Sequence, residues 1–138
     1  MGSLIEDHAA HVLPPRAGQT LVIATDSTAR SYDISALLMG DIAPGETRRH
    51  EVFVCVVAET VDAYINFSTV AKTVSDTAAS AAGTSPPAYA DGHSLRVPSG
   101  GIMPFRFRLD RQLDKFLNVK TAATGGLLRI WVSSPEAA

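Results

Sequence analysis

Histidine is the residue type in this chain that could most readily bind a metal ion. His8 and His11 have a spacing of three, which could place both imidazoles on one face of a helix. Two prolines follow closely and disfavour a stable helix, and no third ligand lies nearby in the sequence. His50 precedes an apolar segment and His93 follows an Asp-Gly pair, so each is typical of a surface residue. We expect no metal site.

Nucleophilic catalysis would require an activated cysteine or serine. Cys55 lies inside the apolar run at residues 52–57, where a free cysteine usually serves as a small buried hydrophobic residue. As a lone cysteine, it cannot form an intramolecular disulfide and fits assembly in a reducing compartment. The Gly-Thr-Ser-Pro segment at 83–86 resembles a hydrolase nucleophile elbow only superficially. The sequence therefore predicts no catalytic residue and no cofactor, and hence a protein that is not an enzyme.

Basic side chains in the C-terminal half form the one charge pattern that could recognise a partner. They are Arg96, Arg106, Arg108, Arg111, Lys115, Lys120 and Arg129. They could pair with carboxylates of another protein, for which the arginine fork is suited. Alternatively, they form the solvated face of a sheet and discourage edge aggregation. Arg48 and Arg49 form a shorter cluster with the same two interpretations.

Composition limits the class of protein. The 138 residues are 46% hydrophobic and 19% charged, which is typical of one globular domain. The net charge of -2 disfavours direct nucleic-acid binding, which normally requires a basic excess. No apolar stretch approaches the roughly 20 residues that span a bilayer. The start of the chain also lacks the pattern of a signal peptide.

Short apolar or alternating segments predict strands rather than long helices. The expected strands lie at 20–24, 31–34, 51–58, 61–67, 105–109, 116–120 and 127–133. Residues 35–40 could equally form a helical turn that ends at glycine. The segments 51–58 and 61–67 are separated by a short turn, which predicts a hairpin.

These segments predict an all-β, single-domain antiparallel β-sandwich, jelly-roll-like in its closure. We expect an extended N-terminal arm at 1–19, a sandwich domain at 20–134 and a tail at 135–138. Within the domain, residues 69–94 form a long loop of small and polar side chains. A loop of this length usually carries function or is mobile. We favour a segment that orders against a neighbouring subunit, and a floppy surface insertion is the alternative.

Several segments resemble small virion proteins of tailed bacteriophages. The strand at 59–67, with aspartate, tyrosine and phenylalanine after a turn, is similar to a recurring strand of these proteins. A loop of small residues then precedes Leu-Arg-Val-Pro-Ser-Gly at 95–100, which looks like one of their turns. Residues 117–130 are similar to their closing hairpin. The resemblance covers about two thirds of the chain and implies a capsid decoration (cement) protein.

The resemblance implies a protein of the outer capsid surface, made in the host cytoplasm, that binds the major capsid protein and stabilises the head. It also implies self-association as a homodimer or homotrimer, without direct contact to nucleic acid or membrane. The candidate partner-contact residues are Arg48, Arg49, Arg96, Arg106, Arg108, Arg129, Trp131, Pro86 and Pro87. One alternative is a head–tail connector or a tail or fibre component. Another is a carbohydrate-binding β-sandwich in which Trp131 and Tyr64 stack on sugar rings.

Overall fold

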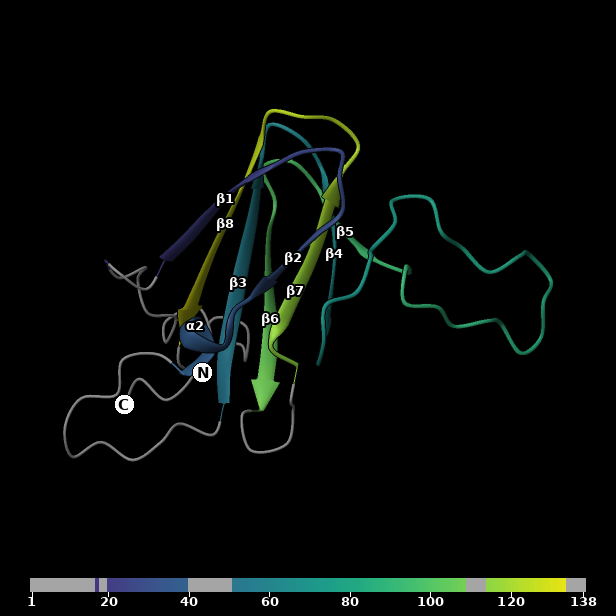
Figure 1. Ribbon diagram of the computed structural model, residues 1–138, viewed down its shortest axis with the longest axis horizontal. Helices are drawn as coiled ribbons and strands as arrows, with labels where there is room; N and C mark the ends of the chain where they lie inside the picture. The colour runs from purple at the N-terminus through teal and green to yellow at the C-terminus, as the bar shows by residue number, and fades with distance from the viewer. Residues whose placement is uncertain (1–16, 18–19, 40–50, 109–113, 134–138) are drawn as a thin grey trace, which may run out of the picture.

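Two four-stranded antiparallel sheets pack face to face in the computed structural model of the chain (Figure 1). The structure describes residues 17, 20–39, 51–108 and 114–133. Sheet A has the strand order β1-β8-β3-β6, and sheet B has the order β2-β7-β4-β5. The elements are β1 (Thr20–Thr25), β2 (Arg30–Asp33), α2 (Ser35–Met39), β3 (Glu51–Glu59), β4 (Ala63–Ser68), β5 (Leu95–Val97), β6 (Ile102–Arg108), β7 (Phe116–Thr121) and β8 (Gly126–Ser133). The predicted all-β sandwich is confirmed.

Strand pairing in the two sheets is nested. The first strand pairs with the last, β2 with β7, β3 with β6, and β4 with β5. Every connection along the chain therefore crosses from one sheet to the other, except the connection from β4 to β5, which stays within sheet B. The long loop at 69–94 is this one connection within a sheet, at the innermost turn of the nested arrangement.

The predicted hairpin between residues 51–58 and 61–67 is wrong. β3 lies in sheet A and β4 in sheet B, so the short turn between them carries the chain across the sandwich. The ending at 117–130 departs from a hairpin in the same way, because β7 and β8 lie in different sheets. In each of these two cases, β3 with β4 and β7 with β8, both strands have an apolar face. The two faces are buried because the strands lie in opposite sheets and pack against each other across the core.

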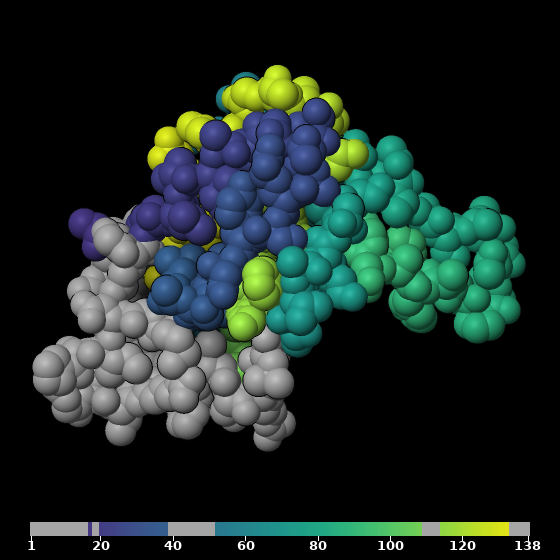
Figure 2. All heavy atoms as spheres, viewed as in Figure 1, coloured from purple at the N-terminus to yellow at the C-terminus, as the bar shows by residue number. Residues whose placement is uncertain are grey.

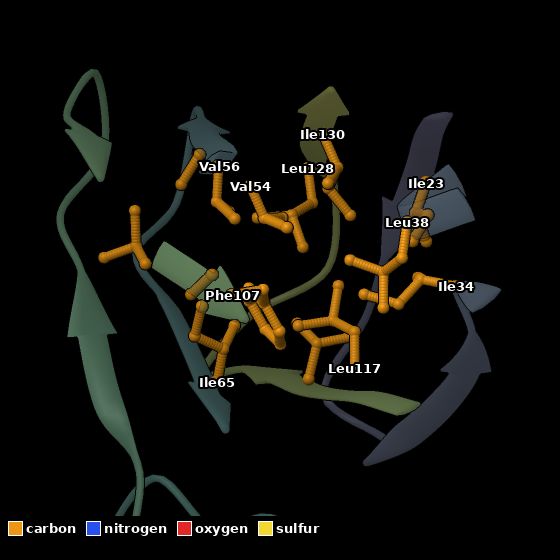
Figure 3. Packing of buried hydrophobic residues seen from close by; sticks show 14 of the residues in the cluster. Ile23, Ile34, Leu38, Val54, Val56, Ile65, Phe107, Leu117, Leu128 and Ile130 are labelled. Carbon is orange, nitrogen blue, oxygen red and sulfur yellow. The ribbon is translucent and has the colours of Figure 1, made fainter. Parts of the chain in front are cut away.

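Alternating apolar side chains build the core between the sheets. Val54, Val56 and Ala58 of β3 are fully buried, and so are Leu128 and Ile130 of β8. Figure 3 shows Val54 and Leu128 of sheet A facing side chains of sheet B that include Leu117. Burial of one large aliphatic side chain stabilises a fold by about 1.5–3 kcal/mol, so this alternation is the main source of stability.

Aromatic contacts join the two sheets near the β4 and β6 strands. The Phe67 ring of β4 lies edge-on to those of Phe105 and Phe107 of β6, with centroids 5.3 and 5.0 Å away. This geometry brings the positive edge of one ring to the negative face of another. Phe105 and Phe107 thus share the inward face, as their spacing predicts.

The segment after β2 forms the short helix α2, which decides between the two alternatives for residues 35–40. Asp33 Oδ1 accepts hydrogen bonds from the Ser35 backbone N–H at 2.9 Å and from Ser35 Oγ at 2.6 Å. Such bonds satisfy a donor at the start of a helix. Ile34 and Leu38 are buried, at 1% and 6% exposure, so α2 contributes to the core. The predicted N-terminal arm, apart from Ala17, and the predicted tail lie outside the described residues.

Candidate functional site

The long loop projects from the sandwich beside β4 and β5, on the side away from β1 (Figure 1). Figure 2 shows it as a separate lobe of the surface. We divide it into a loop base, residues 72–76 and 91–94, and a loop tip, residues 77–90. The base lies against the outer face of sheet B, and the tip extends beyond it. The candidate site is this loop, because it is the part of the described chain that reaches farthest from the core.

The first half of the loop base, residues 72–76, is held by Asn118 of β7. Asn118 is fully buried, and its Oδ1 accepts hydrogen bonds from the Lys72 N–H at 3.1 Å and from Ser31 Oγ at 2.6 Å. Its Nδ2 donates to Asn66 Oδ1 and to Ser68 Oγ, both at 2.8 Å. All the hydrogen-bonding capacity of the amide is used, which a buried amide requires.

The second half of the loop base, residues 91–94, is held by Asn66 of β4. Asn66 Nδ2 donates to the carbonyl oxygens of Asp91 and His93, each at 2.8 Å. Because Asn66 Oδ1 accepts from Asn118, one chain of hydrogen bonds fixes both halves of the base to sheet B. We call Asn66, Asn118, Ser31 and Ser68 the amide network.

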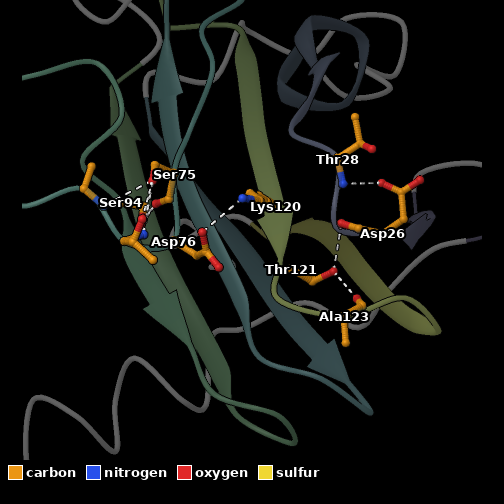
Figure 4. A network of polar contacts seen from close by, with 10 residues as sticks. Asp26, Thr28, Ser75, Asp76, Ser94, Lys120, Thr121 and Ala123 are labelled. Atoms are coloured by element: carbon orange, nitrogen blue, oxygen red, sulfur yellow. Dashed lines mark hydrogen bonds and ion pairs between the residues drawn. The ribbon is translucent and has the colours of Figure 1, made fainter.

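The two halves of the loop base also bond to each other. The Ser75 N–H donates to the Gly92 carbonyl at 2.9 Å. Ser94 Oγ donates to the Ser75 carbonyl at 2.9 Å (Figure 4). Val74 is 1% exposed although it stands among small polar residues. The base is therefore built into the fold.

An ion pair adds to the attachment of the base. Lys120 Nζ of β7 donates to Asp76 Oδ1 at 3.0 Å (Figure 4). Hydrogen bonding from the Lys120 ammonium is the main cause that lowers the pKa of Asp76 below its ordinary value of 3.8. Both side chains are more than two-thirds covered, so the pair is less screened by solvent than a fully exposed one.

The loop tip has no charged residue and is almost wholly exposed. Tyr89 is 90% exposed, and Pro86 and Pro87 lie beside it on the surface. Ser80 Oγ accepts a hydrogen bond from the Ala88 N–H at 3.0 Å, which links the two halves of the tip. Tyrosine is enriched at protein interfaces, whereas alanine and serine, which make up most of the tip, are depleted there, so Tyr89 is the side chain of the tip best suited to a protein contact.

The predicted basic residues do not form one stripe. Arg96 of β5 lies on sheet B and binds Asp62 Oδ2 through Nε at 2.9 Å and Nη2 at 2.6 Å. Arg129 of β8 lies on the outer face of sheet A, where its Nε donates to Glu59 Oε1 at 2.7 Å. Arg106 and Arg108 are exposed on β6. Arg48 and Arg49 lie outside the described residues.

Asp62 does more than pair with Arg96. Its Oδ1 accepts a hydrogen bond from the Ser99 N–H at 2.7 Å, so the carboxylate joins the residue before β4 to the turn after β5. This backbone hydrogen bond, followed by those from Arg96, lowers the pKa of Asp62 below 3.8. Arg96 is thus paired with a carboxylate of its own chain, and this ion pair is a role of Arg96 within the fold.

Trp131 and Tyr64 lie on opposite outer faces of the sandwich. Trp131 of β8 faces outward from sheet A, and Tyr64 of β4 faces outward from sheet B. Both are partly buried, and Trp131 Nε1 is buried without a hydrogen-bond partner among the described residues. The two rings therefore could not stack on the same sugar, and the carbohydrate-binding alternative would need a separate site on each face.

Groups that could perform chemistry are dispersed in the described part of the chain. It contains no group of three histidine, cysteine, aspartate or glutamate side chains that could hold a metal ion. Cys55 is buried at 4% exposure, as expected for a small hydrophobic residue. A groove between β4 and β6 is lined mainly by Phe67, Phe105 and Phe107, with Asp114 as its one carboxylate among the described residues. In the same part of the chain, no helix has the length and apolar character needed to cross a membrane.

Comparisons with models of protein families, with curated proteins and with solved structures found no match to this chain. Sequence reasoning found the long loop but missed the amide network. Asn66 and Asn118 occupy outward strand positions, where a polar residue is ordinarily exposed. Only the pairing register, which places Asn66 opposite Asn118, brings them together.

Proposed function

We propose that the protein is a structural component of a phage particle that decorates the capsid. In this proposal the loop tip contacts the major capsid protein on the outer surface of the head, and the sandwich is the rigid body that holds the loop in place. The observation that carries the proposal is a neutral, exposed loop tip on a base that the amide network fixes to sheet B.

The physical advantage of a fixed base is a smaller entropic cost of binding. A flexible segment must be ordered when it binds, whereas a loop that is already attached at both halves loses less conformational freedom. The small side chains of the tip let its backbone approach another surface closely. Each contact is weak, but a symmetric lattice multiplies it over many copies.

The nested strand pairing supports the proposal at the level of the fold. A pairing of first with last and second with seventh is what a long hairpin rolled into two sheets would give, and we infer a jelly-roll winding. Capsid and other viral proteins use this winding among many other classes, so it is compatible with a virion role without requiring one.

Quantitative mass spectrometry of purified particles tests the proposal. We expect the protein in the particles in on the order of hundreds of copies, as a lattice decoration requires. A count of about six to twelve would favour a ring-shaped connector or tail component, and would overturn decoration. Absence from the particles would overturn any virion role.

A further inference from the structure

Four strands form the edges of the two sheets: β1 and β6 in sheet A, and β2 and β5 in sheet B. An edge strand exposes unpaired backbone groups that can pair with another chain, and proteins usually block such edges. Three of these edges carry the usual protection. β6 contains a proline and two arginines, β2 is four residues long with Arg30 and Asp33 at its ends, and β5 is three residues long with Arg96 at its centre.

β1 lacks every one of these devices. Its sequence, Thr-Leu-Val-Ile-Ala-Thr, has no proline and no charge, and it extends over six residues. Among the described residues it pairs with β8 alone. Val22, at its centre, is 45% exposed. Figure 2 shows the purple segment that contains β1 at the molecular surface. An apolar and regular edge of this kind, without proline or charge in the strand itself, is typical of a strand that pairs in an assembly.

We propose that β1 is the self-association edge of the protein, and that two copies pair their β1 strands antiparallel about a two-fold axis at Val22. In this register Leu21 lies opposite Ile23 of the second copy, and Thr20 lies opposite Ala24. The pairing joins two four-stranded sheets into one continuous eight-stranded sheet. The strand that pairs with this edge is thus β1 of a second copy of the protein.

The faces of β1 are compatible with this register, as they are with any register in which the two-fold axis passes through a residue. Ile23 is buried in the core and Leu21 packs against it, whereas Thr20, Val22 and Ala24 are exposed on the other face. A two-fold axis at Val22 pairs inward residues with inward residues and outward residues with outward residues. A register shifted by one residue would oppose Val22 to Ile23 and bring an exposed side chain to the core face.

Charges near the edge are compatible with two copies in contact. Arg129 lies beside Val22 on β8, so in the dimer its Cα would be three strand spacings, about 14 Å, from that of its symmetry mate. Its charge is compensated within each copy by Glu59, with Nε and Oε1 2.7 Å apart. An isologous pairing therefore brings no uncompensated like charges together at β1.

The proposed dimer leaves the long loop free. The loop extends from the opposite side of the sandwich to β1 (Figure 1), so the two loops of a dimer point away from the shared edge. A dimer would present two loop tips at once, which raises the effective affinity for a repeating surface. The self-association itself does not depend on the capsid role and can be tested on the purified protein.

Sedimentation of the purified chain tests the pairing. We expect the wild-type protein to sediment as a dimer, and Val22→Lys to sediment as a monomer with an unchanged circular dichroism spectrum, because two lysines would oppose each other at the axis. Ile102→Lys is the matched control: Ile102 is exposed on β6, the other edge of the same sheet, and the variant should remain dimeric. A monomeric wild-type protein, or a dimeric Val22→Lys, would overturn the proposal.

Disulfide formation tests the register. Val22→Cys places two thiols opposite each other at the axis, within the Cα separation that a disulfide requires, and mild oxidation should yield a covalent dimer. Ala24→Cys, on the same strand and face, lies opposite Thr20 and should give at least about tenfold less covalent dimer. Equal or greater cross-linking of Ala24→Cys would show that the strands do not pair at Val22. The wild-type chain, with its buried Cys55, measures the background.

Discussion

Asn118 Nδ2 on β7 donates a hydrogen bond to Asn66 Oδ1 on β4, with the two atoms 2.8 Å apart. The two residues lie directly opposite each other in the register of sheet B, yet each bonds to a different half of the long loop. Asn118 binds the Lys72 N–H, and Asn66 binds the carbonyls of Asp91 and His93. One pair of amides therefore links the sandwich to the loop that we propose as its contact element.

We predict that Asn118→Ala destabilises the protein strongly. The change removes four hydrogen bonds at a fully buried position and leaves the Lys72 N–H without its acceptor. The expected loss in the free energy of unfolding is about 2–4 kcal/mol, measured by urea denaturation. Ser31→Ala removes one of these bonds and should cost about 0.5–1.5 kcal/mol. A loss below about 0.5 kcal/mol for Asn118→Ala would show that the amide network contributes little.

We predict that the Asp76–Lys120 pair stabilises the fold at neutral pH and ceases to do so in acid. The pKa of Asp76 is lowered in the folded state by the Lys120 hydrogen bond, so the unfolded chain takes up a proton more readily. The stabilisation is therefore fully present above the ordinary value of 3.8 and is lost as the pH falls through the lower, folded-state pKa.

The test compares the wild-type protein with Asp76→Asn by urea denaturation from about pH 6 to about pH 2. The wild type should be the more stable of the two at the upper end, and the difference should shrink as the pH falls. A difference that stays constant over the whole range would contradict an electrostatic role for this carboxylate.

We predict that Gly126→Ala is destabilising because the start of β8 is closely packed. A Cβ at this position would collide with Val61 Cγ2 and would lie 2.6 Å from Thr25 Oγ1. Both neighbours are β-branched and have little rotamer freedom, so we expect a cost of about 1–3 kcal/mol in the free energy of unfolding. Gly92→Ala is the control: its Cβ would meet nothing closer than 3.5 Å, and we expect a gain of up to about 1 kcal/mol. Equal effects of the two changes would contradict the packing argument.

The sequence predicted the inward faces of the strands correctly. Apolar side chains occupy alternate positions in the segments 61–67 and 128–132. The buried residues follow that alternation: Ala63, Ile65, Leu128 and Ile130. An apolar face must be buried whatever lies opposite it, so the period of two is a reliable signal. The alternation does not indicate which strand pairs with a given strand, or to which sheet that strand belongs.

The connections that pass from one sheet to the other show why strand pairing could not be predicted from the alternation of apolar residues. A short turn between two strands is compatible with a hairpin and with a passage from one sheet to the other. At the β3–β4 connection, Thr60 adopts a φ of 76°, and the chain leaves sheet A. The amide network was missed for a related reason, because Ser31, Asn66 and Asn118 become neighbours only through the register of three strands.

Replacement of the loop tip tests whether the tip is the element that contacts the capsid. Residues 77–90 would be exchanged for a short Gly-Ser turn that keeps the loop base and the amide network, and binding to purified particles that lack the protein would be measured by co-sedimentation. We expect a folded variant, with a free energy of unfolding within about 1 kcal/mol of the wild type, that no longer binds the particles. Undiminished binding of that variant would contradict the claim that the loop tip is the contact element.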